Sequence, residues 1–434
     1  MTAELNSHTS VRRTELCGLG MVSGASLLQM EHEFSIFLLT AGACYVLAFL
    51  TSYAFVRLLL PEKLKDALGH DGRFVAIDGI RGYLAFGVYV HHCLVTWMLL
   101  RQGQWLVPNH NFENQLGKTS VAIFFMITAF LFWGRAVSKR AVDVKAFFLS
   151  RLFRIYPLYL FVVLVICLAV GFKTGWSAHE SPAKIALEVG KWLLLRTPTI
   201  NLYAGTAIVV AGVTWTLLYE AWFYSSLPFL AGIFLRKLPV WKTLLAAAII
   251  AVLFWANHLG LPITATFVGG FVAVYWRMDA QRIELAKSKT AAVLALISLI
   301  SVVVFLYDPF NILGILLLTV FFVVIASGNT LFGLLKMRSA LWLGEISYSI
   351  YLCHGLILWV VMQNVLPRFS GYRPTVTFFV LSAIGITPVV ILFSSVSFLF
   401  LERPFIAIGH RISKRSPVDA PVTKPEVSVV PQLG

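Results

Sequence analysis

The sequence predicts an all-α protein, a polytopic membrane bundle of about eleven transmembrane helices. Of its 434 residues, 59% are hydrophobic and only 13% are charged, against roughly 25% charged residues in soluble domains. The hydrophobic residues gather in runs long enough to cross the roughly 30 Å hydrocarbon core of a bilayer as helices. The net charge of +15 comes from Lys and Arg between these runs, so it indicates orientation in a membrane and argues against nucleic-acid binding.

The expected helices follow directly from the apolar runs and their lengths. Gly260 and Pro262 break the chain between two neighbouring runs. Lys and Arg are concentrated in alternate connecting segments, which predicts an external N-terminus and a cytoplasmic C-terminus. The helices are expected at residues 33–60, 82–100, 119–134, 155–172, 216–235, 241–258, 260–276, 291–307, 310–327, 342–363 and 376–401.

Three segments fall outside these helices. Residues 1–32 are expected to form an external N-terminal segment, and the Pro-rich residues 411–434 a disordered cytoplasmic tail. Residues 173–215 form the longest external stretch and are moderately apolar, which favours a partly re-entrant loop or a small lid. The five cysteines show no CxxC spacing, so we expect neither a metal site nor a disulfide framework.

The stretch IDGIRGYLAFGVYVHH at 77–92 is apolar enough to span a membrane, yet it carries four ionisable side chains. On a helix, Arg81 lies at about 300° and His92 at about 320° from Asp78, whereas His91 lies at about 220°. Asp78, Arg81 and His92 therefore share a stripe, with His92 about 21 Å along the axis from Asp78. Ionisable groups in a spanning helix are costly and indicate a functional site. The plain alternative is an ion pair at the helix start and a histidine bonded to a carbonyl group.

Two arginines precede the helix expected at 155–172, in the sequence RLFRIYPLY. Arg151 and Arg154 are three residues apart, so their guanidinium groups point the same way and offer two forks to a phosphorylated ligand. Pro157 suits the first turn of the helix that follows. The alternative is the excess of Arg found at any cytoplasmic helix end.

Two later helices also carry polar residues among apolar ones. Glu220, in WTLLYEAWFY, is expected near the outer end of the helix 216–235, where it could orient or deprotonate a histidine or an acceptor hydroxyl group. In SYSIYLCHG, Ser347 and His354 lie within about 20° of each other on a helix, and Tyr351 is one turn from His354. The aromatic residues also suit an interfacial belt, and the serines suit contacts between helices.

Taken together and in this order, these segments resemble the acyltransferase 3 family of integral membrane acyltransferases. IDGIRGYLAFGVYVHH is similar to the family's LDGLRG segment with its membrane histidine, and RLFRIYP is similar to its RxxR-I-x-P segment. WTLLYEAWFY, SYSIYLCH and LERPF, which contains Glu402, are similar to three later segments of the family. The resemblance covers residues 74–410, the expected membrane acyltransferase domain, and makes the helix 33–60 an addition to the family's usual ten-helix core.

The resemblance implies transfer of an acyl group, usually acetyl from acetyl-coenzyme A, to a hydroxyl group of a carbohydrate or lipid-linked glycan at the bacterial inner membrane. It implies that His92 is the general base or is itself acylated, and that Glu220 orients the acceptor or tunes His92. The phosphates of the donor would bind Arg81, Arg151 and Arg154. The expected partners are acyl-coenzyme A, the glycan and membrane lipid, with no permanently bound cofactor and no metal. Supporting roles are expected for Asp78, Trp215, Tyr348, His354 and Glu402.

Two departures from the family pattern keep other functions open. Thr128 and Ala129 stand where the family usually has a Ser-Gly pair, and Cys353 replaces the usual Trp before the histidine. One alternative is a proton-coupled transporter of a small solute, although the sequence shows no internal repeat of the transporter kind. The other is a catalytically silent homologue, in which loss of His92 has no effect. Several acceptors are compatible: O-antigen, exopolysaccharide, peptidoglycan, a nodulation-type oligosaccharide or a macrolide.

Overall fold

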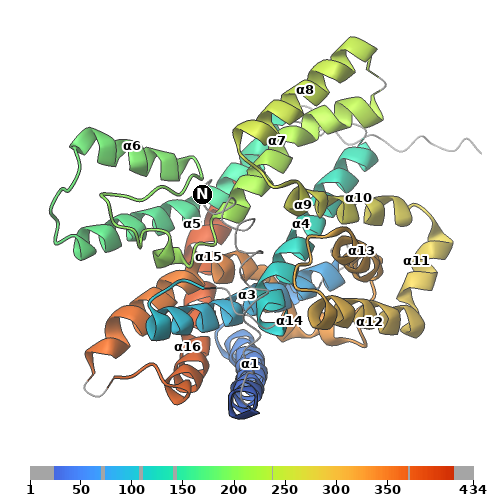
Figure 1. Cartoon of the computed structure of the whole chain (residues 1–434). Coiled ribbons are helices and arrows are strands. Elements are labelled where there is room, and N and C mark those ends of the chain that lie inside the picture. Colours follow the sequence, from blue (N-terminus) through green and yellow to red (C-terminus); the bar gives the residue numbers. More distant parts are fainter. Residues whose placement is uncertain are drawn as a thin grey trace, which may run out of the picture.

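The computed structural model is a bundle of helices, with no strand in the part of the chain that it describes (Figure 1). This architecture confirms the predicted all-α class. The structure describes residues 24–69, 74–106, 111–139, 144–236, 238–369 and 372–414. The expected terminal segments 1–32 and 411–434 lie mostly outside these residues. Of the two segments, residues 24–32 belong to the first helix and residues 411–414 to the last.

Every predicted membrane segment falls on one helix of the structure or on a consecutive group of helical elements. The longer helices are α1 (Gly24–Leu58), α3 (Val75–Gln102), α4 (Asn111–Lys139), α5 (Val144–Lys173), α7 (Trp215–Leu235) and α16 (Val376–Ser397). The shorter helices are α2 (Glu62–Ala67), α6 (Pro182–Leu193), α8 (Val240–Ala256), α9 (Leu261–Ala265), α10 (Phe267–Trp276), α11 (Ala280–Lys287), α12 (Lys289–Phe305), α13 (Ile312–Ala326), α14 (Arg338–Glu345), α15 (Ser347–Leu358) and α17 (Arg403–Lys414). Short 3₁₀ turns are η3 (Ile208–Val210), η4 (Leu334–Lys336) and η6 (Leu366–Arg368), and π-helical turns are η5 (Trp359–Val365) and η7 (Phe398–Glu402).

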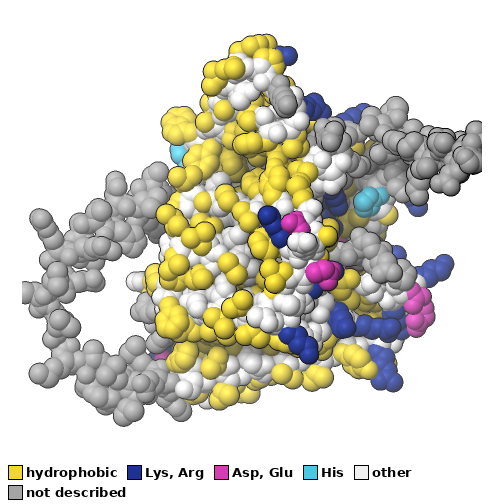
Figure 2. Space-filling model, turned by 90° about the vertical axis from the view of Figure 1, so that its right-hand side faces the viewer, with side chains coloured by type: hydrophobic (Ala, Val, Ile, Leu, Met, Phe, Trp, Pro, Cys, Tyr) yellow, Lys and Arg dark blue, Asp and Glu magenta, His cyan; other side chains and the backbone are white. Residues whose placement is uncertain are grey.

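The helix lengths fit a multi-pass membrane protein. Among the described residues, six helical stretches are long and apolar enough to cross a membrane, or seven if α11 and α12, bent by 73°, form one span. Three further apolar helices, which the sequence predicted as full spans, have only 10–17 residues. Hydrophobic side chains cover the left half of the face in Figure 2, whereas charged side chains gather on its right half. So large an apolar surface suits contact with lipid chains.

The helices α3 and α4 begin earlier than the apolar runs predicted. The early turns of α3 carry Asp78 and Arg81, and those of α4 carry polar residues such as Gln115. Such residues are tolerated in a spanning helix where they face the interior of a bundle. Gln115 does so, since its amide donates a 2.6 Å hydrogen bond to the carbonyl group of Leu306.

The sequence predicted Pro157 in the first turn of a helix. In the structure it lies inside α5, because the helix already begins at Val144. Proline is tolerated inside a membrane helix when neighbouring groups bond the backbone carbonyls around it. Two residues before the proline, the hydroxyl group of Tyr348 donates a 2.9 Å hydrogen bond to the carbonyl group of Ile155. This bond joins α15 to α5 next to Pro157.

Residues 173–215 fold back into the bundle. After α5, the chain turns and α6 lies beside that helix (Figure 1), with the Tyr159 hydroxyl donating a 2.7 Å hydrogen bond to the carbonyl group of Trp192. The turn η3 then packs on α15 so closely that a Cβ on Gly355 would lie 2.3 Å from the carbonyl carbon of Val210. As a result α7 begins among other helices, where Thr216 and the Tyr351 hydroxyl are 2.8 Å apart. Glu220 lies one turn further along α7.

The glycines of the IDGIRG segment bring α3 into backbone contact with η4 and α14. A Cβ on Gly79 would lie 1.9 Å from the carbonyl oxygen of Leu335, and a Cβ on Gly344 would lie 1.8 Å from that of Asp78. Real Cβ atoms are not accommodated at such distances, so only glycine allows this approach. The close packing fixes the first turns of α3, and with them the positions of Asp78 and Arg81.

We expect Gly344→Ala to destabilise the protein by about 1–3 kcal/mol, because the added methyl group forces α14 away from the backbone of α3. Gly385, inside α16, has no heavy atom within 4 Å of an added Cβ. Gly385→Ala is therefore the matched control, and it should leave stability unchanged or raise it slightly. Thermal unfolding of the purified variants in detergent measures both effects, and equal midpoints for the two would contradict the packing argument.

Candidate active site

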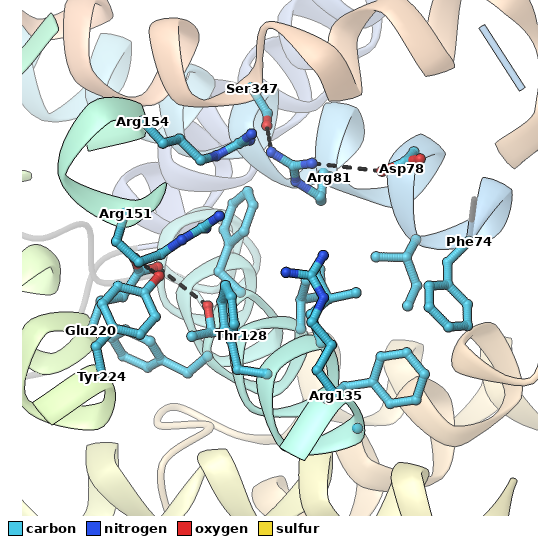
Figure 3. A pocket seen from close by; sticks show the side chains of 18 of the residues that line it. Phe74, Asp78, Arg81, Thr128, Arg135, Arg151, Arg154, Glu220, Tyr224 and Ser347 are labelled. Atoms are coloured by element: carbon cyan, nitrogen blue, oxygen red, sulfur yellow. Dashed lines mark hydrogen bonds and ion pairs between the residues drawn. The ribbon is translucent and has the colours of Figure 1, made fainter. Parts of the chain in front are cut away.

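A cavity of about 760 Å³ lies between α3, α4, α5, α7, α10 and α15. Its volume falls within the range of roughly 300–1,000 Å³ that is typical of small-molecule sites. Figure 3 shows labelled side chains from these helices pointing into the same space. Of the residues singled out in the sequence, the cavity brings together Asp78, Arg81, Arg151, Arg154, Glu220, Ser347, Tyr348 and Tyr351.

The lining of the cavity is strongly basic. In addition to the three arginines expected from the sequence, Arg135 at the end of α4 and Arg277 directly after α10 line it. The described lining thus has five guanidinium groups and two carboxylates, Asp78 and Glu220. No sequence pattern separates Arg135 and Arg277 from the other arginines that lie between membrane helices. A cavity of this charge favours a ligand with several negative charges.

Arg81 is held from two helices. Its guanidinium group donates a 2.9 Å hydrogen bond to the Ser347 hydroxyl of α15 and lies 3.6 Å from the Asp78 carboxylate of α3 (Figure 3). The pair is i, i+3 on one helix, and each side chain is about one-fifth exposed. Asp78 and Ser347 therefore orient Arg81 toward the cavity before any ligand binds.

Arg154 lies within electrostatic range of Arg81, Arg135 and Arg151, all of the same sign. Like charges gathered in a partly buried space repel one another, and the repulsion is relieved when an anion enters. Arg151 also lies 4.7 Å from the ring centroid of Phe132, in a cation–π contact. The cluster is therefore more stable with a polyanionic ligand than without one.

Glu220 lies in the wall of this cavity beside Arg151. Its carboxylate accepts hydrogen bonds from the Tyr224 hydroxyl at 2.9 Å and the Thr128 hydroxyl at 3.4 Å (Figure 3). Thr128 thus supplies a hydroxyl group where the family usually has Ser. The next residue, Ala129, meets Gly270 of α10, where an added Cβ would lie 2.5 Å from the Ala129 side chain. The family usually has glycine at the position of Ala129. Here the facing helix α10 has the glycine, Gly270, which leaves room for the Ala129 side chain.

His92 and His354 form a pair next to the deep end of the cavity. Nδ1 of His92 lies 2.9 Å from the carbonyl oxygen of Val88 and 3.1 Å from Nε2 of His354, whose own Nδ1 lies 2.8 Å from the carbonyl oxygen of Ile350. A carbonyl oxygen only accepts hydrogen bonds, so in neutral rings each Nδ1 carries the hydrogen and each Nε2 carries a lone pair. The Nε2 of His354 then accepts from His92, and Nε2 of His92 remains free as a base or nucleophile.

Tyr351 separates the cavity from the histidine pair. It lines the cavity, and its ring centroid is 6.4 Å from that of His354. Its hydroxyl group donates a 3.1 Å hydrogen bond to the carbonyl oxygen of Val213 and lies 2.8 Å from that of Thr216. Among the described residues that line the cavity, neither histidine appears. On its other side, the partly exposed His92 stacks with the Trp105 ring at a centroid distance of 6.2 Å.

Three other residues considered in the sequence lie outside the cavity lining. His91 faces α4, where its Nδ1 lies 2.8 Å from the carbonyl oxygen of Glu113, so it joins two helices. Trp215 packs edge-on against Tyr219 at 5.5 Å. Glu402, fully buried, accepts a hydrogen bond from Ser349, and its charge interacts with Arg154 and Arg81 from behind the cavity.

The comparisons with known proteins match the part of the chain that contains this site. The profile of a family described as "Acyltransferase domain" matches residues 74–395. The Exopolysaccharide production protein ExoZ of Rhizobium meliloti (strain 1021) is 27% identical over 316 residues, which cover 69% of this chain and 92% of the relative. No solved structure matches the chain. The matched region contains every residue of the cavity lining and both histidines.

Proposed function

Because the chain belongs to the acyltransferase family that matches residues 74–395, we propose that it transfers an acetyl group from cytoplasmic acyl-coenzyme A to a hydroxyl group of a carbohydrate or lipid-linked glycan at the inner membrane. The observation that carries the proposal is the cavity with five arginines, which ends one tyrosine away from a histidine pair. A donor with several phosphates and a neutral thioester arm has the charge distribution that this cavity favours.

The position of the charges supports a cytoplasmic donor. Arg135, Arg151 and Arg154 belong to the segment 135–154, and Arg277 begins the segment 277–289, both of which the Lys and Arg distribution places inside. The phosphates would bind these arginines and Arg81. The deep end of the cavity, with Thr216, Phe124 and Tyr351, would then hold the thioester.

The chemistry assigned to His92 follows from its tautomer. Nε2 accepts the proton of the acceptor hydroxyl group while the hydroxyl oxygen attacks the thioester carbonyl carbon. The carbon–sulfur bond breaks, and the coenzyme leaves as a thiol after taking up the proton. In the alternative two-step route, Nε2 attacks the thioester itself and the acyl-histidine then passes its acyl group to the acceptor. Both routes need the same nitrogen.

Two observations support a polysaccharide acceptor. The relative from Rhizobium meliloti is named for exopolysaccharide production. In addition, Trp105, which is partly exposed and is not among the described residues that line the cavity, stacks on His92, and its ring offers an apolar face to a sugar ring. The acceptor would therefore reach His92 from the side opposite to the donor.

The proposal is tested with purified protein in nanodiscs and radiolabelled acetyl-coenzyme A, with and without a bacterial exopolysaccharide. Release of free coenzyme together with labelled polysaccharide supports the proposal. Label that stays on the protein without an acceptor, and is lost on adding one, identifies the two-step route. If coenzyme neither binds nor is consumed under any of these conditions, the proposal is wrong and a solute-transport assay is the next experiment.

We expect His354→Gln to lower kcat by about tenfold, with little change in the KM for acetyl-coenzyme A, because His354 orients His92 without touching the donor. His354→Phe removes the side-chain acceptor of the His92 hydrogen and leaves only the carbonyl oxygen of Val88, and a larger loss is expected. A pH–rate profile that shifts between wild type and His354→Gln would show that the residue acts through His92. An unchanged profile with a proportional loss of folded protein would show that its role is only structural.

A further inference from the structure

One end of the cavity contains an aromatic and cationic cluster whose aromatic rings have no role in binding the phosphates or the thioester of a donor. Phe74, Phe130, Arg277 and Met278 line this end of the cavity together with Arg135. In Figure 3, Phe74 and Arg135 lie on one side of the space, and Arg151 and Glu220 lie on the other. The cavity is thus divided into an aromatic part and a part rich in arginines and hydroxyl groups.

The aromatic part is built from three elements. Phe74 immediately precedes α3, Phe130 lies on α4, and the guanidinium group of Arg277 follows α10. The Arg277 guanidinium carbon is 4.7 Å from the Phe74 ring centroid and 5.7 Å from that of Phe130, and the two rings meet edge-on at 5.1 Å. Arg277 is fixed there by a 2.8 Å hydrogen bond from its guanidinium group to the carbonyl oxygen of Ala326.

The exposure of these residues shows which face is open to a ligand. Phe130 is buried, with 4% of its surface exposed, whereas Phe74 is 41% exposed although it lines the cavity. An exposed phenyl ring with a guanidinium group over it is a surface on which nucleic-acid bases stack. A phosphate binds the guanidinium group but has no aromatic face to stack on the Phe74 ring.

We propose that Phe74 and Arg277 form the binding site for a purine base, and that they select a donor whose acyl group is carried on a nucleotide. The inference rests on the proposed function and deepens it. The base stacks on Phe74 at this end of the cavity, Arg135 and the other arginines bind the phosphates that follow, and the thioester arm extends toward Tyr351. Along the cavity, the order of aromatic, cationic and hydroxyl-bearing groups then matches the order of base, phosphates and thioester in the donor.

The test compares two ligands that both carry the base, coenzyme A and adenosine 3′,5′-bisphosphate, in equilibrium binding to the full-length protein in nanodiscs. Phe74→Ala is expected to weaken the binding of both by about 5- to 50-fold, as removal of a stacking ring does. Phe74→Trp should restore wild-type binding of both. Phe172→Ala is the matched control, because Phe172 is 56% exposed, lies at the far end of α5 and is absent from the described cavity lining.

The following outcomes would overturn or separate the proposals. Wild-type binding of both ligands in Phe74→Ala, or loss of coenzyme A binding with retention of the bisphosphate, shows that the base does not lie on Phe74. Equal losses in Phe74→Ala and Phe172→Ala, with poor monodispersity, show that Phe74→Ala acts through folding. If wild type binds neither ligand but consumes another acyl donor, the base site is wrong and the acyl transfer stands; if it consumes none, the proposed function itself fails.

Discussion

Replacing His92 by Asn is expected to lower kcat for acetyl transfer by about 10²- to 10⁴-fold while the affinity for acetyl-coenzyme A stays near that of wild type. The asparagine amide nitrogen occupies nearly the position of the imidazole Nδ1, so it still donates to the Val88 carbonyl group and to His354. The variant lacks only Nε2, the atom that accepts the proton or attacks the thioester. Steady-state release of coenzyme A and equilibrium donor binding measure the two quantities separately.

The matched control is His91→Asn on the same turn of α3. His91 bonds the carbonyl group of Glu113 through Nδ1, and the asparagine amide can keep that bond. The kcat of the His91→Asn variant should therefore stay within a few-fold of that of wild type. An active His92→Asn variant, or equal losses in both variants, would show that His92 is not the reacting group and would favour the silent-homologue alternative.

Replacing Arg154 by Gln is expected to weaken the binding of acetyl-coenzyme A by about 10- to 100-fold, since one hydrogen bond to a charged group contributes about 1.5–3 kcal/mol. Within the part of the chain that the structure describes, no side-chain hydrogen bond or ion pair engages Arg154. Its removal reduces the repulsion among the remaining arginines and also removes its attraction to Glu220 and Glu402, so the stability of the variant should stay near that of wild type. Isothermal titration of the donor and thermal unfolding test the two expectations together.

Two further variants make the interpretation of Arg154 specific. Arg154→Lys keeps the charge but not the planar fork, and an intermediate loss of affinity is expected. Arg236→Gln removes an exposed arginine at the end of α7, outside the described cavity lining, and should bind the donor as wild type does. Undiminished binding in Arg154→Gln would contradict the assignment of this cavity to the donor phosphates.

The sequence predicted the fold class and the location of the helices because apolar runs alone determine where a chain can cross a bilayer. It placed the start of α3 too late, since Asp78 and Arg81 end the apolar run although the helix continues through them. The fold of residues 173–215 was left open, because the moderately apolar composition of that segment does not predict that α6 packs against α5.

Part of the site was accessible to sequence reasoning and part was not. Helical spacing put Ser347, Tyr351 and His354 on one face, and in the structure that face runs from the cavity to the histidine pair. His92 and His354 are in contact although they are 262 positions apart in the sequence. A local sequence pattern does not predict a contact between residues so far apart. Arg135 and Arg277 were passed over because arginine is common at the ends of membrane helices, and only the closure of the bundle distinguishes these two.

The position of Tyr351 also affects how easily ions could pass through the bundle and so dissipate the membrane potential. A donor cavity on one side of this residue and a partly exposed His92 on the other are separated by a ring whose hydroxyl group is bonded to the Val213 carbonyl group. Each elementary charge that moves through a membrane held at about 100 mV dissipates about 2.3 kcal/mol. In the proposed reaction, with donor and acceptor on opposite sides of the membrane, the Tyr351 ring at this point would limit the leakage of ions while the acyl group crosses.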